Sequence, residues 1–213
     1  MPVVIVLAFI WAPPAESLGE TARLIFFHVP VAWSSFFAFV IAGMYSIAYL
    51  FDKEKKFRGL DEKAYNSAVI GFVFTVLAVI SGSIWAKMTW GTFWNWDPRE
   101  TSIVIVLLIY IAYFSLQAAM AGNENRGKIG SSYLIVAMVM MPFFIFIVPR
   151  IYLSLHPNTI INAQRKILMD SRMLITLLTS IATFTLLYFY IFQLMNRLAA
   201  IKIRIEDALH DEE

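Results

Sequence analysis

A short stretch from Trp85 to Thr101, reading WAKMTWGTFWNWDPRET, contains four of the six tryptophans of this chain. Tryptophan is common at membrane surfaces, because its ring is apolar and its N–H can face the headgroup layer. Four tryptophans so close together, interrupted by Gly91, exceed what anchoring needs. We therefore interpret the stretch as a flat aromatic platform for a large planar ligand, with a simple aromatic belt as the alternative.

Two of the three histidines, His28 and His156, sit where connectors meet predicted helices. A lone histidine at a helix entrance is most simply a capping or interfacial group. Two of them beside an aromatic platform favour bis-imidazole ligation of an iron porphyrin, because neutral imidazole is a good axial ligand for haem iron. Zinc is the weaker interpretation, since there is no H-E-x-x-H motif and no obvious third ligand. His210, in the acidic tail, is interpreted as solvated.

Other residue types narrow the chemistry further. The chain has no cysteine, so any haem would be held without covalent bonds to the protein. There is no G-x-x-x-x-G-K-[ST] phosphate loop with which the chain could hydrolyse ATP. Cations that could meet the propionates of a porphyrin are Arg23, Lys87, Arg99 and Arg150.

The composition is that of a membrane protein. The 213 residues are 60% hydrophobic and only 15% charged, with a mean hydropathy of +0.70, whereas a soluble domain has about a quarter charged residues. Apolar runs near the length of a membrane span recur along the chain. The net charge of +2 is too small to suggest nucleic acid as a partner. We predict an all-α polytopic membrane protein, with no cleavable signal peptide pattern at its start.

Six apolar runs predict about six transmembrane helices. They cover Val3–Trp11, Pro30–Phe51, Ala64–Ile84, Pro98–Met120, Ser132–Val148 and Met173–Leu194. The first is about half the length needed to cross a bilayer, and we favour a true helix start upstream of it over incomplete insertion. We predict that residues 1–213 form a single membrane domain that ends in a charged cytoplasmic tail, 199–213.

The connectors are expected to differ in character. Ala15–Phe27 is predicted to be a polar connector, with Pro30 in the first turn of the helix that follows it. Gly122–Gly130 is predicted to be a flexible turn, and Pro149 to end the fifth helix. Asp97, Pro98 and Glu100 match the N-cap, N1 and N3 positions of a capping box. This capping role already explains Asp97, although its carboxylate could also bind a ligand or an indole N–H.

The basic residues predict the orientation. Of the 17 lysines and arginines, ten fall on one side of the predicted helices and seven on the other. The positive-inside rule places the richer side in the cytoplasm. The tryptophan stretch, His28 and His156 would then share the outer face.

WGTFWNWDPRET resembles the tryptophan-rich WWD signature of haem-handling membrane proteins in cytochrome c biogenesis. The segment HVPVAW, His28 to Trp33, resembles the segment that precedes the second helix in one branch of these proteins. That branch is the haem exporter protein C family of the system I maturation machinery. The resemblance covers about residues 12–198. It implies that haem b is held non-covalently at the outer face, with axial ligands at His28 and His156. By motif, the platform residues are Trp90, Gly91, Trp94, Trp96 and Asp97, to which we add Arg99 as a candidate cation.

The resemblance also implies partner proteins and a location in the cell. Such a protein hands haem to a periplasmic haem chaperone, with the help of a small single-helix subunit and an ABC-transporter pair that uses ATP. It would be a multi-pass protein of a bacterial or archaeal cytoplasmic membrane, and not itself an enzyme.

Two alternatives remain at this point. Glu100 makes the sequence DPRET similar to the larger system II proteins, which deliver haem directly to apocytochrome c, although those carry further histidines within their helices. A purely structural or transport subunit would use its tryptophans only as anchors. A quinol-oxidising cytochrome b is disfavoured, because its ligands would lie on membrane-buried helix faces.

Overall fold

A computed structural model describes residues 1–16, 18–52, 54, 59–156 and 169–210 of the chain, and within these residues it contains helices and no strand. The α-helices are α1 (Pro2–Val6), α2 (Ile25–Phe51), α3 (Leu60–Trp90), α4 (Pro98–Ala119), α5 (Arg126–Pro142), α6 (Val148–Ile151) and α7 (Ser171–His210). The π-helices η1 (Leu7–Trp11) and η3 (Phe143–Ile147) extend α1 and α5, and the 3₁₀-helix η2 (Glu20–Leu24) leads into α2.

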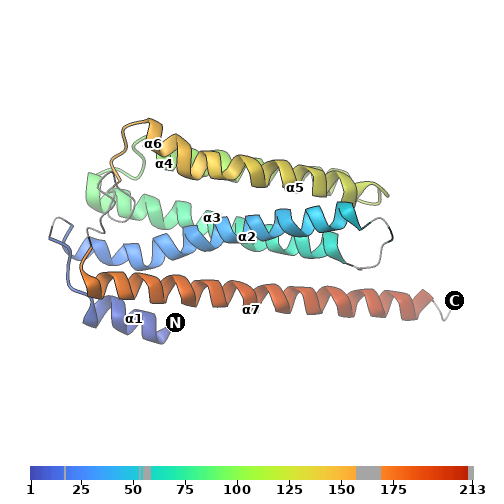
Figure 1. The fold of residues 1–213 in the computed structure, drawn as a ribbon, viewed down its shortest axis with the longest axis horizontal. Coiled ribbons are helices and arrows are strands. Elements are labelled where there is room, and N and C mark those ends of the chain that lie inside the picture. The colour runs from blue at the N-terminus through green and yellow to red at the C-terminus, as the bar shows by residue number, and fades with distance from the viewer. Residues whose placement is uncertain (17, 53, 55–58, 157–168, 211–213) are drawn as a thin grey trace.

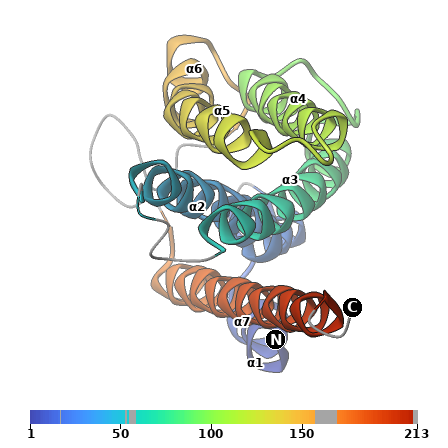
Figure 2. The same ribbon diagram turned by 90° about the vertical axis from the view of Figure 1, so that its right-hand side faces the viewer.

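The long helices form three layers (Figures 1 and 2). α2 and α3 form the middle layer, α4 and α5 cover one side of it, and α7 with the short α1 covers the other. α2 begins, α3 ends, and α4 and α7 begin at the same end of the bundle (Figure 1). The predicted site residues on these segments are thereby brought to one end of the molecule.

Five helical segments in the described part of the chain are long and apolar enough to cross a membrane. They are Glu20–Phe51, Leu60–Trp90, Pro98–Ala119, Arg126–Ile151 and Ser171–Lys202, and the apolar segment Pro2–Trp11 is shorter. Many large apolar side chains on their outer faces are exposed, such as Met44, Val73, Val136 and Leu186, which suits contact with lipid. The structure confirms the all-α polytopic fold, with five long helices and a short first one.

Small and hydroxyl-bearing residues allow the middle-layer helices to pack closely. A Cβ added at Gly71 of α3 would lie 2.7 Å from the Phe39 ring of α2, so that position requires the missing side chain. The hydroxyls of Ser35 and Thr75 lie 2.5 Å apart across the same interface. Close backbone approach and hydrogen bonds between helices hold membrane bundles together in the absence of a strong hydrophobic effect.

The predicted connector before the second helix was too long, because the helix begins at Ile25 and not at Pro30. His28 therefore lies within α2, and Pro30 lies inside the helix. Proline has no N–H to give to the carbonyl four residues earlier, which here belongs to Phe26. Ser180 of α7 donates its hydroxyl to that carbonyl. A neighbouring helix thus satisfies the group that Pro30 leaves unpaired, which is how proline is tolerated in transmembrane helices.

α3 also extends beyond its prediction at both ends. It continues through Trp85 to Trp90, and Gly91 ends it with a left-handed backbone, φ 87°. Glycine is preferred at this position because it has no Cβ to clash. Half of the predicted tryptophan loop is therefore helix.

α5 begins at Arg126, so Gly127 and Gly130 are helical residues and not part of a flexible turn. A Cβ on Gly127 would lie 2.6 Å from the Tyr49 hydroxyl, and one on Gly130 would lie 1.9 Å from Gln117 Nε2. These glycines permit close helix packing, and Gly122, with φ 78°, is the turn glycine. Pro149 does not end the fifth helix, since it occupies the first turn of α6.

The last predicted helix and part of the tail form one continuous helix, α7, which extends from Ser171 to His210. The predicted start of the fourth helix is confirmed. Asp97 is the N-cap of α4, Pro98 follows it, and the capping box with Glu100 is present.

The bond between Ser180 and Phe26 predicts a coupled effect on stability. Ser180→Ala should lower the free energy of unfolding by about 1 kcal/mol, because it leaves a buried carbonyl unpaired. In a Pro30→Ala background the backbone supplies an N–H for the same carbonyl, so Ser180→Ala should cost less there. Thermal unfolding of the four variants in detergent tests this coupling. Equal costs in both backgrounds would contradict it.

Candidate functional site

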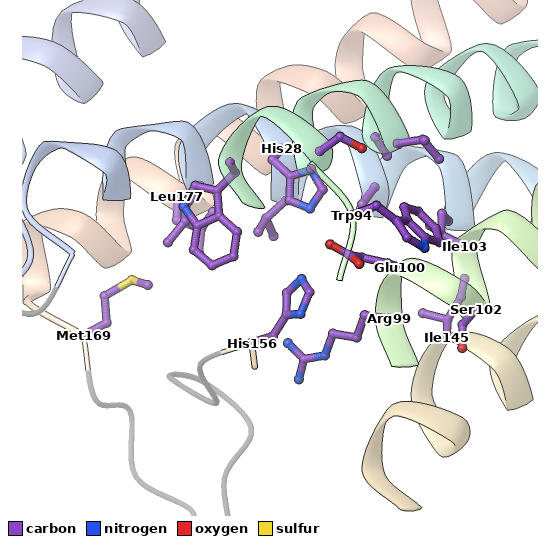
Figure 3. Close-up of a pocket in the computed structure, with 18 residues that line it drawn as sticks. His28, Trp94, Arg99, Glu100, Ser102, Ile103, Ile145, His156, Met169 and Leu177 are labelled. Atoms are coloured by element: carbon purple, nitrogen blue, oxygen red, sulfur yellow. The ribbon is translucent and has the colours of Figure 1, made fainter. Parts of the chain in front are cut away.

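A cavity of about 270 Å³ lies at the end of the bundle where α2 begins and α3 ends. Its walls come from α2, α3, α4, η3, α7 and the segment after α6, and they are mainly apolar. The polar or aromatic residues that line it are His28, Ser83, Trp85, Trp94, Arg99, Glu100, Ser102 and His156. Figure 3 shows the His28 and His156 rings pointing into this cavity from opposite sides, with Arg99 beside His156.

His28 enters the cavity from α2 and is supported by α3. Its Nδ1 lies 3.0 Å from the hydroxyl oxygen of Ser81. A Cβ on Gly82 would lie 2.9 Å from the ring's Cε1, so the ring lies directly against the α3 backbone. The predicted place of His28 at a helix entrance is corrected, because it is a helical residue within the segment long enough to cross a membrane.

His156 reaches the cavity from the segment that follows α6. Its ring contacts two tryptophans of α3, at centroid distances of 5.7 Å to Trp85 and 4.9 Å to Trp90. Its Nδ1 lies 3.0 Å from Oδ1 of Asp97, a short contact whose angles do not meet those of a hydrogen bond. His28 and His156 are close enough to interact electrostatically, although 128 positions separate them in the sequence.

Asp97 connects this segment to the start of α4. Its buried carboxylate accepts hydrogen bonds from the Arg99 N–H at 2.8 Å, the Leu155 N–H at 2.7 Å and the Ser154 hydroxyl at 3.0 Å. The residue is thus both the predicted helix cap and the acceptor that holds residues 154–156 against the tryptophan loop. The second role could not be read from the sequence.

The charges of this pair follow from their surroundings. Burial lowers the pKa of His156, and Arg99 lowers it further, which together outweigh the opposing effect of Asp97. Burial acts to raise the pKa of Asp97, but the N–H groups of Arg99 and Leu155, with His156 and the Ser154 hydroxyl, together lower the net pKa. Near neutral pH, His156 is therefore neutral and Asp97 ionised. A neutral imidazole is the form that can bind a metal.

The tryptophan rings do not form the flat platform that we expected. Trp85 and Trp90 pack edge to face at 75°, and Trp94 and Trp96 do so at 85°. Only Trp85 and Trp94 line the cavity, while Trp90 packs against His156 and Trp96 is 77% exposed. Aromatic rings prefer such edge contacts to parallel stacking in register. The stretch therefore forms part of the cavity wall, through Trp85 and Trp94, and an exposed edge beside it, at Trp96.

The structure distinguishes between the four candidate cations. Arg99 lines the cavity. Arg23 donates to the carbonyls of Ala8 and Ala12. Lys87 donates to the Gly91 carbonyl, and Arg150 to the Phe146 carbonyl. Of these four, Arg99 is the one placed to meet a negative charge in the cavity.

Several cavity residues on α3 were not among the predicted site residues. Ala78, Gly82 and Trp85 line one face at helical spacing, with Ser81 beside them. The pattern i, i+4, i+7 is present in the sequence. It would have indicated this face if the helix had been extended to Trp90, but the run of tryptophans was interpreted as a loop.

The fold and the site together define a class, a polytopic α-helical membrane protein with two histidines in an apolar, tryptophan-lined cavity at one end. The family model described as "Heme exporter protein C" matches residues 1–210, and the chain belongs to this family. Among the described residues, no group of three or more His, Cys, Asp or Glu side chains could hold a metal ion alone. The family's description names a haem exporter.

Individual relatives are similar in the same way. The heme exporter protein C of Bradyrhizobium diazoefficiens is 33% identical over 177 residues, which cover 83% of this chain and 66% of the relative. The one from Rhodobacter capsulatus is 33% identical over 63% of this chain and 54% of the relative. The one from Escherichia coli K12 is 31% identical over 66% of this chain and 58% of the relative. The chain thus spans less than two thirds of the length of these relatives.

The Asp97 network predicts how residues 154–156 respond to its loss. Asp97→Ala should lower the free energy of unfolding by about 1–2 kcal/mol, because the cap of α4 is lost. It should also speed amide hydrogen exchange at Leu155, whose N–H loses its acceptor. Exchange read by mass spectrometry on peptides that include 152–156 tests this.

Asp170→Ala is the matched control, because Asp170 accepts from the Arg172 N–H at the start of α7, as Asp97 accepts from the Arg99 N–H at the start of α4. It should leave exchange at Leu155 unchanged. Equal exchange at Leu155 in the Asp97→Ala variant and the unmodified protein would show that Asp97 does not hold residues 154–156.

Proposed function

We propose that this chain binds haem as cargo between His28 and His156 and delivers it during cytochrome c maturation. The observation that carries the proposal is that imidazoles from two distant segments point into one mainly apolar cavity. The family's description and the relatives' names agree with haem handling.

The residues at the cavity suit a porphyrin bound through its iron. Each histidine has its Nδ1 beside an oxygen, of Ser81 or of Asp97, so that Nε2 is the nitrogen left to face the cavity. A ligating histidine in a metal protein is commonly held in this way, through its other ring nitrogen. Apolar walls suit the macrocycle, and Arg99 is placed to meet a carboxylate. The bound haem would supply an iron centre with two axial positions for these imidazoles.

Each residue then has a defined part. His28 and His156 hold the iron, Asp97 orients His156, and Arg99 compensates the negative charge of the propionates. Trp85 and Trp94 exclude water from the cavity, whereas Trp90 supports the His156 ring and Gly91 ends α3 so that the loop can return towards α4. Because the chain has no cysteine, it can form no thioether bonds to the haem, which suits a non-covalently bound haem b that is released again.

We further propose that the recipient is a periplasmic haem chaperone, and that an ABC-transporter pair and a small single-helix subunit assist. The excess of lysine and arginine at the opposite end supports an outward-facing site in a bacterial or archaeal cytoplasmic membrane. Direct delivery to apocytochrome by a system II-type protein gains no support from Glu100. Its Oε2 accepts from the Asn95 and Asp97 N–H groups, so the loop's own capping explains this glutamate.

Replacement of the histidines should change the haem spectrum. The haem-loaded protein should show the absorption of six-coordinate, low-spin iron. His28→Ala and His156→Ala should each weaken haem affinity at least about tenfold, and added imidazole should restore the low-spin spectrum. Absorption titration of the purified protein in detergent measures both effects.

His210→Ala is the control, because His210 is the last residue of α7, far from the cavity along a 40-residue helix. It should titrate like the unmodified protein. An unchanged spectrum and affinity in the double variant of His28 and His156 would reject the proposed ligands.

The proposed orientation can be tested by labelling, because the chain has no cysteine of its own. Phe93→Cys lies in the exposed loop between α3 and α4, and Asn123→Cys in the exposed turn between α4 and α5, at the other end. A membrane-impermeant maleimide should label the first variant in intact cells, and the second only after lysis. The reverse pattern would place the site in the cytoplasm.

A further inference from the structure

Ser81 has a hydrogen-bond arrangement that constrains the proton on His28. Its hydroxyl donates to the Leu77 carbonyl, four residues earlier on α3, at 2.7 Å. A serine hydroxyl has one proton to donate and two lone pairs that accept. With the hydroxyl donating to Leu77, the Ser81 oxygen is available to accept from His28, whose Nδ1 lies 3.0 Å away. This arrangement favours the tautomer in which Nδ1 carries the proton and Nε2 the free lone pair.

We propose that Ser81 is a positioning residue that sets the tautomer and orientation of His28 for iron binding. This inference rests on the function proposed above, and it adds a residue that contacts neither the iron nor the porphyrin. A histidine bound to a metal through Nε2 needs a partner for its Nδ1–H, and the partner tunes the ligand. Ser81 supplies it from the neighbouring helix.

Gly82 completes the support of the ring. A Cβ at this position would lie 2.9 Å from Cε1 and 3.5 Å from Nδ1 of His28. The ring is therefore held by a hydrogen bond to Ser81 and by direct contact with the α3 backbone at Gly82. Because both residues belong to one rigid helix turn, the ring has little freedom to rotate.

The two imidazoles are thereby supported unequally. His28 faces a neutral hydroxyl, whereas His156 faces the carboxylate of Asp97. A carboxylate partner makes an imidazole a stronger electron donor than a hydroxyl does. Ser81 therefore supports the ligand on the α2 side, whereas the ligand on the other side depends on Asp97.

Haem titration of Ser81 variants in detergent tests this role. Ser81→Ala should weaken haem affinity about tenfold and shift the haem midpoint potential to more positive values, because His28 loses the acceptor of its Nδ1–H. Ser81→Thr keeps the hydroxyl and should restore both affinity and potential. The thermal stability of the haem-free Ser81→Ala protein should stay close to that of the unmodified chain, which separates positioning from a loss of folding.

Ser115→Ala is the matched control, because Ser115 makes the same bond to the carbonyl four residues earlier, on an exposed face of α4. It should leave affinity and potential unchanged. Gly82→Ala should lower haem affinity through steric displacement of His28, while the added methyl group favours the helix itself.

The outcomes separate this inference from the proposed function. If the unmodified protein binds no haem, or if His28→Ala binds it equally well, the proposed function fails and this inference with it. If His28→Ala weakens binding but Ser81→Ala keeps both the affinity and the potential of the unmodified protein, the positioning role alone is refuted.

Discussion

The buried carboxylate of Asp97 is the interaction on which the site depends. It begins α4, and it accepts from Ser154 and Leu155 of a segment far along the chain. A buried charge is tolerated only where hydrogen bonds compensate it. Those bonds fix where the chain must go after α6. His156 is the next residue, so the tie that satisfies Asp97 also brings an imidazole against Trp85 and Trp90.

The two sides of the cavity are built differently. His28 belongs to a helix in the middle layer, where Ser81 and Gly82 of α3 support its ring and Ser180 of α7 compensates for nearby Pro30. His156 lies outside the helices and is held through Asp97. For a protein proposed to give up its cargo, this arrangement joins a rigid ligand to one held by a few polar bonds.

The cavity suits a mainly apolar guest, and its lining includes one basic residue, Arg99, and one acidic residue, Glu100. Its walls are mainly apolar, and Arg99 lines it beside His156, which is neutral near neutral pH. A low-dielectric wall strengthens the attraction between a guanidinium and a carboxylate. The tryptophans add shape: their edge-to-face packing makes a firm wall of Trp85 and Trp94, with Trp96 exposed at the rim.

The sequence by itself determined the membrane class, the order of the long helices and the capping box at Asp97, because apolar runs and caps are local signals. The start of α2 at Ile25 and the helical glycines Gly127 and Gly130 were decided by tertiary contacts, such as the hydroxyl that Ser180 gives to Phe26. The same holds for the edge-to-face rings, the choice of Arg99 and the support of His28 by Ser81. These features depend on which helix faces which, and no local pattern of residues records that.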